Sequence, residues 1–145
     1  MYKSLGFTLV ISFCIMYTVM FLNVDSMEHI YLSLTRAYMS LLMVSPMSVL
    51  MILSMGKMYP DKKQNALIIG ISVFVFAVSL FALRTQLFIT DQQYMRVMIP
   101  HHSSAIMTSK NAALKDPEDK KLSEQIIKSQ EEEIAQMKQM LERLK

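Results

Sequence analysis

The segment at residues 98–102, Met-Ile-Pro-His-His, combines residue types that bind transition metals. It holds two of the three histidines of the chain, His101 and His102, and Met98 precedes them by three and four residues. On a helix these spacings place side chains on one face. Imidazole nitrogen together with thioether sulfur favours a soft or borderline metal, above all copper. A pair of surface histidines near a helix start would explain the pentapeptide equally well.

Two helices are expected to hold this segment, within a domain at residues 90–145. Thr90 opens a capping-box pattern at the start of the first helix. Pro100 lies inside this helix and is expected to bend it beside the histidines. Asp116 followed by Pro117 fits the N-cap and first position of a second helix. The apolar residues of that second helix alternate at spacings of three and four, which is typical of a coiled-coil seam.

A tight turn between these helices would make them antiparallel and would set which residues face each other. With a turn at residues 115–117, His102 lies opposite Gln130, and Glu133 lies within one helical turn of the histidines. Met137 lies one turn further along, near the methionine that precedes the histidine pair. The second helix therefore brings an amide, a carboxylate and a thioether to the level of the imidazoles, which favours a metal site over a plain helical hairpin.

The first 89 residues form a different, apolar domain. The chain of 145 residues is 52% hydrophobic and only 19% charged, and residues 1–89 contain only 3 of its 12 acidic side chains. Three stretches are long enough to cross a bilayer core of about 30 Å as helices. We predict transmembrane helices at about residues 5–22, 37–58 and 66–88. No small-residue cleavage site follows the first, which is therefore expected to be an uncleaved anchor.

The charges of the loops predict how these helices are oriented. Lys3 precedes the first, and the second loop carries three lysines, whereas the first loop carries Asp25 and Glu28 and has Arg36 only at its far end. An excess of Lys and Arg marks the cytoplasmic side. We therefore expect a multi-pass protein of the bacterial inner (plasma) membrane. Its N-terminus would be cytoplasmic, and residues 90–145 would be periplasmic or extracellular.

Other features of the composition limit the possible functions. The nine basic and nine acidic residues at 90–145 form no basic stripe, so nucleic acid is not an expected partner. Cys14 is the single cysteine, which excludes a disulfide within the chain. Five methionines repeat every four residues in the second span. Such a ladder could pass Cu(I) along the helix, although methionine more often serves as an adaptable packing residue. These residues are Met39, Met43, Met47, Met51 and Met55.

A pair of helices of about 55 residues buries little apolar surface by itself. A second copy would complete a four-helix bundle, a fold in which metal sites form from inward-facing side chains. We therefore predict an all-α fold with three transmembrane helices followed by an extracytoplasmic antiparallel helical hairpin. This hairpin is expected to complete a four-helix bundle by self-association, as a homodimer or a higher homo-oligomer. Membrane lipid and a metal ion are the other expected partners, and the sequence identifies no protein partner.

Residues 91–112 (DQQYMRVMIPHHSSAIMTSKNA) and 130–137 (QEEEIAQM) resemble a bacterial family catalogued as domain of unknown function 305. Its members share an M-I-x-H-H segment and a second helix with Q-x-x-E-I-x-x-M. The resemblance implies a ferritin-like fold and, for some members, periplasmic copper binding associated with copper tolerance. The chain is similar to a membrane-anchored branch that carries one hairpin.

The same resemblance implies a copper site, with Cu(I) favoured and Cu(II) possible through histidine and glutamate. Many members carry a methionine six residues after the second histidine. This chain has Thr108 there, so one thioether of the usual set is absent. The expected metal-site residues are Met98, His101, His102 and Met137, with Glu133 nearby.

Three functions compete on this sequence. The first is a non-enzymatic, membrane-anchored copper-binding protein. The second is a membrane-tethered helical module for protein–protein interaction that has no metal role. The third, a metalloenzyme, is disfavoured. Di-iron bundles use a Glu-x-x-His motif, and no histidine of this chain has a glutamate three residues before it.

Overall fold

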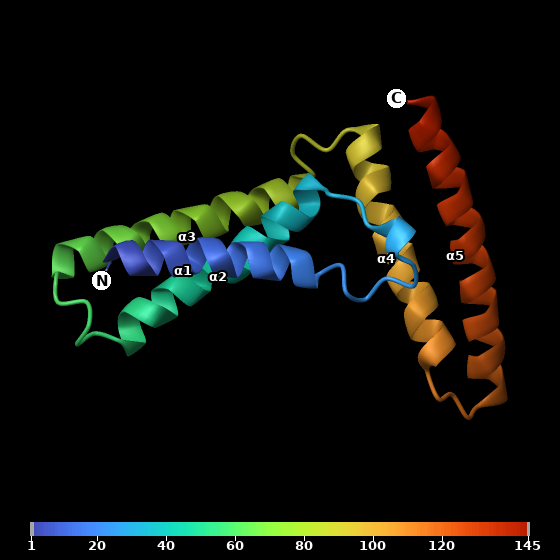
Figure 1. Ribbon diagram of the computed structural model, residues 1–145, viewed down its shortest axis with the longest axis horizontal. Coiled ribbons are helices and arrows are strands. Elements are labelled where there is room, and N and C mark those ends of the chain that lie inside the picture. Colours follow the sequence, from blue (N-terminus) through green and yellow to red (C-terminus); the bar gives the residue numbers. More distant parts are fainter. Residues whose placement is uncertain (1, 145) are drawn as a thin grey trace. The chain divides into compact units, whose positions relative to one another are not determined.

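The computed structural model describes residues 2–144, which form five α-helices and one short 3₁₀ helix and contain no β-strand (Figure 1). Contacts divide the chain into two compact units. The first unit comprises the N-terminal segment through Met20 together with Leu34–Phe88, and the second comprises Phe21–Ser33 and the chain from Ile89 onward. The elements are α1 (Tyr2–Val19), η1 (Met27–His29), α2 (Leu34–Ser54), α3 (Lys62–Thr85), α4 (Asp91–Asn111) and α5 (Pro117–Arg143).

The first unit contains three helices that are long and apolar enough to cross a membrane, which confirms this part of the prediction. Helices α1, α2 and α3 have 18, 21 and 24 residues and mean hydropathies of 1.4, 1.7 and 2.7. Each begins three or four residues earlier than the apolar stretches predict. At α3 the cause is visible: the Asp61 carboxylate accepts hydrogen bonds from the backbone N–H groups of Lys63 and Gln64. The N-cap, and not the first apolar residue, sets the start of this helix.

Little of the first unit's apolar surface is covered by the unit itself. Helix α2 packs against both α1 and α3, with Leu5, Ile52 and Tyr59 at the centre of a small cluster. Large side chains such as Phe7 and Phe74 remain 68% and 67% exposed. A surface of this kind suits the hydrocarbon of a bilayer, where neighbouring lipid tails replace water.

The predicted methionine ladder, whose last member Met55 directly follows α2, does not face one environment. Met39, Met43 and Met55 are exposed, whereas Met51 packs against the Leu5–Ile52–Tyr59 cluster. This follows from the four-residue spacing, because each step turns about 40° further round the helix.

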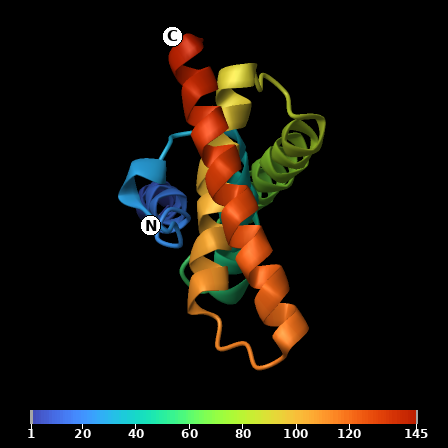
Figure 2. The ribbon, with the colours of Figure 1, turned by 90° about the vertical axis from the view of Figure 1, so that its right-hand side faces the viewer.

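In the second unit, α4 and α5 lie side by side (Figures 1 and 2). At one end the Ser123 hydroxyl donates to the Ser109 carbonyl over 3.2 Å. At the other end the Gln92 side-chain amide donates to the carbonyl of Leu144. The end of α4 therefore lies beside the start of α5, and the start of α4 lies beside the end of α5. Their shared core consists of Met95, Ile99, Ile106, Ile134 and Leu141, with Ile127, Met137 and Leu144 packed against it.

Capping side chains fix the starts of both helices as predicted. The Thr90 hydroxyl accepts from the N–H of Gln93, and Asp116 accepts from the N–H groups of Glu118 and Asp119. Pro100 lies within α4, and its side chain is fully buried. The cap at Thr90 fixes the first residue of α4 and thereby the positions of His101 and His102 along this helix.

Candidate metal centre

The two adjacent histidines of α4 occupy different environments. His102 is 8% exposed, whereas His101 is exposed, and their ring centroids are 6.3 Å apart. Successive residues on an α-helix point about 100° apart, so only one of two neighbours can face α5. The helix pair therefore receives one imidazole, that of His102, and presents the other at its surface.

Glu133 of α5 lies beside the buried imidazole. The His102 Nδ1 atom lies 3.2 Å from Oε2 of Glu133. This distance is short enough for an ion pair, yet Nδ1 has no hydrogen-bond partner of acceptable geometry among residues 2–144. We therefore describe the contact as electrostatic. It leaves a buried nitrogen beside a carboxylate without the hydrogen bond that such atoms normally make.

Ser129, one turn earlier on α5, orients the carboxylate. Its hydroxyl donates to Oε1 of Glu133 over 2.9 Å. Oε1 is thereby occupied, and Oε2 remains to face His102. Serine and glutamate four residues apart share a helix face, so the spacing of Ser129 and Glu133 is a sequence signal for this contact.

Burial makes the charged form of His102 unfavourable. It lowers the pKa of His102 below its usual value of 6.5, the Glu133 carboxylate opposes this shift, and the imidazole of His101 adds to it. A lowered pKa keeps His102 neutral, which is the form in which imidazole binds metals.

The donor atoms fit a metal ion only in part. Bonds of about 2.0 Å from one tetrahedral ion place two ligand atoms roughly 3.3 Å apart, which is close to the His102–Glu133 separation. However, no group of three or more His, Cys, Asp or Glu side chains able to hold a metal ion occurs within residues 2–144. The other metal ligands expected on these two helices are thioethers. Met98 and Met137 are both partly buried, and Met137 packs against the core of the helix pair.

The segment Phe21–Ser33 is the main feature that the sequence analysis missed. The sequence predicts that residues 21 and 22 belong to the first transmembrane helix and that residues 23–36 are a loop of the anchor, yet the segment contacts α4 next to the histidines. The fully buried Ser103 hydroxyl accepts from the Asp25 backbone N–H over 2.8 Å and lies 2.8 Å from Nδ1 of His29. Asn23 donates to the hydroxyl of Ser104 over 2.8 Å. The third histidine of the chain is thereby bound to the residue after His102.

Ion pairs attach the same segment to both helices. Lys110 of α4 lies 3.0 Å from Asp25 and 3.4 Å from Glu131 of α5, and its hydrogen bond to Asp25 raises the pKa of its ammonium group. Lys138 of α5 lies 3.6 Å from Glu28. Such exposed pairs contribute little energy individually. Together they show that the charges of this segment complement those of the helix pair.

These features define an all-α protein in which three apolar helices carry a separate helix pair, with a buried histidine facing a glutamate. The family described as "Domain of unknown function (DUF305)" matches residues 78–141, and the chain belongs to this family. The match spans α4 and most of α5, including both histidines and Glu133. The family assignment from the sequence motifs is confirmed.

A relative extends the similarity into the apolar helices. The chain is 42% identical over 123 residues to "Uncharacterized protein L153" of Acanthamoeba polyphaga mimivirus, an alignment that covers 83% of this chain and 79% of the relative. Because the alignment covers 83% of this chain, it must include most of the first unit, which the family match at residues 78–141 hardly reaches. The similarity between the two sequences therefore includes residues of both units. No solved structure matches the chain.

Proposed function

We propose that the protein is a membrane-anchored metal-binding protein that binds copper and contributes to copper tolerance, without enzymatic activity. The observation that carries the proposal is the buried Nδ1 of His102, which has no hydrogen-bond partner among residues 2–144 and lies 3.2 Å from Glu133. A buried polar atom without a partner destabilises the fold by about 1–3 kcal/mol. Such an atom beside a carboxylate is explained if both bind one cation.

The nature of the surrounding donors supports copper. Besides the imidazole of His102 and the carboxylate of Glu133, the proposed ligands include the thioethers of Met98 and Met137, and thioethers favour Cu(I). Copper would add a soft, redox-active cation to the helix pair. The residues of the chain would bind it and exclude water. His101 is exposed, so its proposed part is to bind an ion at the surface or to pass one to His102.

The proposed location is the bacterial plasma membrane, with the N-terminus in the cytoplasm and the second unit on the opposite side. Three apolar helices support it, as do Lys57 in the loop between α2 and α3 and Lys62 and Lys63 in the first turn of α3. We further propose self-association of the helix pair as an antiparallel hairpin that completes a four-helix bundle. Leu122, Tyr94 and Met140 are 55%, 53% and 42% exposed on the second unit and offer apolar surface for it.

The test is Cu(I) affinity of the full chain in detergent, measured by competition with a coloured Cu(I) chelator. We expect His102→Ala and Glu133→Gln each to weaken binding at least tenfold, because each removes a proposed ligand. Met137→Leu should weaken binding, whereas Met140→Leu, which changes an exposed methionine of the same helix, should not. Unchanged affinity in the His102→Ala/Glu133→Gln double variant would falsify the proposal.

The exposed side chains of Leu122, Tyr94 and Met140 favour a second candidate, an interaction module without a metal role. The His102→Ala/Glu133→Gln double variant separates the two candidates. If the protein is an interaction module, the unchanged protein and the double variant should have the same oligomeric state, measured by light scattering in detergent. The unchanged protein should then also bind copper no more tightly than the double variant.

A further inference from the structure

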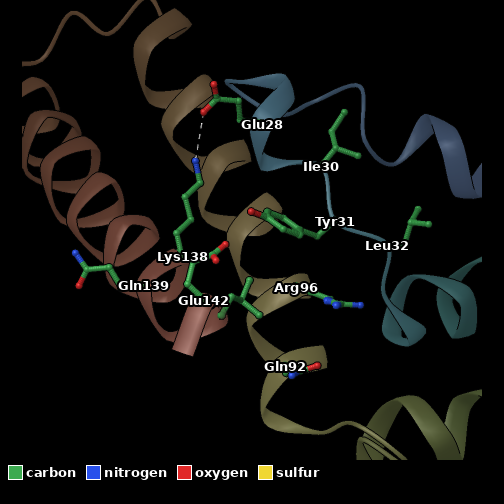
Figure 3. A pocket seen from close by; sticks show the side chains of 10 residues that line it. Glu28, Ile30, Tyr31, Leu32, Gln92, Arg96, Lys138, Gln139 and Glu142 are labelled. Atoms are coloured by element: carbon green, nitrogen blue, oxygen red, sulfur yellow. Dashed lines mark ion pairs between the residues drawn. The ribbon is translucent and has the colours of Figure 1, made fainter. Parts of the chain in front are cut away.

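A cavity of about 600 Å³ lies in the second unit, away from the His102–Glu133 contact along the helix pair. Its walls are the first turns of α4, the last turns of α5 and the stretch from Glu28 to Leu32 (Figure 3). This volume is within the range of small-molecule binding sites. All of its walls belong to one compact unit. Neither the family description nor the proposed copper site gives this cavity a role.

The charged groups of the cavity balance each other. Two are acidic, Glu28 and Glu142, and two are basic, Arg96 and Lys138. Glu28 and Lys138 form an ion pair at 3.6 Å, drawn as the dashed line in Figure 3. The partly buried Arg96 has no hydrogen bond or ion pair with any residue of the described chain. A guanidinium without a partner in a cavity is suited to bind a phosphate group in a bidentate manner.

The remaining wall is apolar. Ile30, Leu32 and Leu141 line the cavity together with the ring of Tyr31, which packs against the core of the helix pair. Leu32 is 66% exposed, so part of this wall is open to the surroundings. The cavity therefore offers both signs of charge beside an apolar surface, a combination that matches an amphipathic zwitterion better than a simple anion.

The chain connects this cavity directly to the apolar helices. One residue, Ser33, separates Leu32 from the start of α2, and six residues separate the end of α3 from Gln92, which also lines the cavity. One residue extends the chain by at most about 3.6 Å. If α2 and α3 cross a membrane, Leu32 lies within about 7 Å of the end of a span, which is the depth of the lipid headgroups.

We propose that this cavity binds the headgroup of a zwitterionic membrane phospholipid. Arg96 would bind the phosphate, Glu28 and Glu142 would face the quaternary or primary ammonium group, and Ile30, Leu32 and Leu141 would contact the upper part of the acyl chains. The lipid would thereby hold the second unit at the membrane surface. The proposal does not depend on metal binding, because it uses none of the proposed metal ligands.

The test uses the full chain in a maltoside detergent, titrated with dihexanoylphosphatidylcholine and followed by NMR signals of the Arg96 side chain and nearby amides. We expect saturable binding that Arg96→Gln weakens at least tenfold. Arg143→Gln, which removes the same charge from an exposed position outside the cavity, should leave binding unchanged. A second variant, Glu28→Gln, should weaken binding of the zwitterionic lipid relative to dihexanoylphosphatidylglycerol. Glu124→Gln, on the exposed side of α5, is its control.

Three further probes identify the source of the signal. Inorganic phosphate or glycerophosphocholine binding as tightly as the short-chain lipid would overturn the proposal, because neither has acyl chains. Phosphatidylglycerol binding more tightly than phosphatidylcholine would overturn the assignment to a zwitterion. Equal effects of Arg96→Gln and Arg143→Gln would show that the cavity is not the site. An amide spectrum of the Arg96 variant that matches the unchanged protein excludes misfolding as the cause.

Discussion

At the scale of single residues, burial separates the three histidines. His102 is buried beside Glu133, His29 lies against Ser103, and His101 is exposed. Burial lowers the pKa of His29 as well as that of His102, with the Lys138 ammonium adding to the shift and Asp25 and Glu28 opposing it. A neutral His29 fits its contact, because the Ser103 hydroxyl accepts from Asp25 and has its own hydrogen left to donate to Nδ1.

The first prediction concerns the pH dependence of His102. Its pKa is lowered on folding, so the folded state binds fewer protons than the unfolded state at pH values just below 6.5. The stability that neutral His102 contributes is complete above pH 6.5 and is lost as the pH falls through the folded pKa. NMR titration of the imidazole in the metal-free full chain should give a midpoint below 6.5.

Glu133→Gln supplies the matched control for this titration. It removes the charge that opposes the shift, so the midpoint of His102 should fall further. A midpoint above 6.5 in the unchanged protein would mean that attraction by Glu133 outweighs burial, which contradicts the prediction.

At the scale of elements, short polar signals decide where the helices begin. Asp61 and Asp116 cap α3 and α5, and Thr90 caps α4. Each is followed by helix positions whose N–H groups have no partner within the helix. Sequence reasoning located the caps of α4 and α5 correctly, because capping is a local interaction. The apolar run predicts a start of α3 four residues late, because the cap at Asp61 lies before the first apolar residue of the helix.

The second prediction tests the cap of α5. Asp116 accepts hydrogen bonds from Glu118 and Asp119 at 2.8 and 3.1 Å, and it lies next to the positive end of the helix. Asp116→Ala should therefore destabilise the second unit by about 1 kcal/mol. Chemical denaturation of the full chain in detergent, followed by circular dichroism, measures this change. Lys120→Ala, at an exposed position of the same helix, should have an effect within about 0.5 kcal/mol. Equal destabilisation by both variants would contradict the role of the cap.

At the scale of the whole molecule, the chain forms two units whose boundary is not where the apolar sequence ends. Phe21–Ser33 connects α1 to α2 along the chain but packs with the helix pair. The segment and α4 lie about 80 residues apart in sequence and meet at the buried hydroxyl of Ser103. The connection between α1 and α2 is thereby part of the unit that carries the histidines.

The third prediction tests this connection. Ser103→Ala removes the acceptor of the Asp25 N–H and the partner of His29, so it should weaken attachment of the segment by about 1–3 kcal/mol. Hydrogen exchange of amides 21–33 in the full chain should become faster, whereas exchange in α5 should change little. Ser109→Ala is the control, because Ser109 accepts from Ser123 only through its backbone carbonyl. Unchanged exchange at residues 21–33 in the Ser103 variant would show that the contact does not hold the segment.

The sequence by itself determined the helical content, three helices able to span a membrane, the caps at Thr90 and Asp116, the family, and the nearness of His102 to Glu133. All of these follow from local physics: apolar runs, hydrogen bonds within one turn, and the 3.6-residue period. Only the tertiary structure decided that His102 is buried and His101 is not, that His29 contacts Ser103, and that a cavity forms beside Arg96. Each of these depends on the rotation of one helix against another or on a contact between distant segments. Helix rotation and contacts between distant segments leave no periodic signal in the sequence. A buried histidine and an exposed one are the same letter, and only the segments that pack over them distinguish the two.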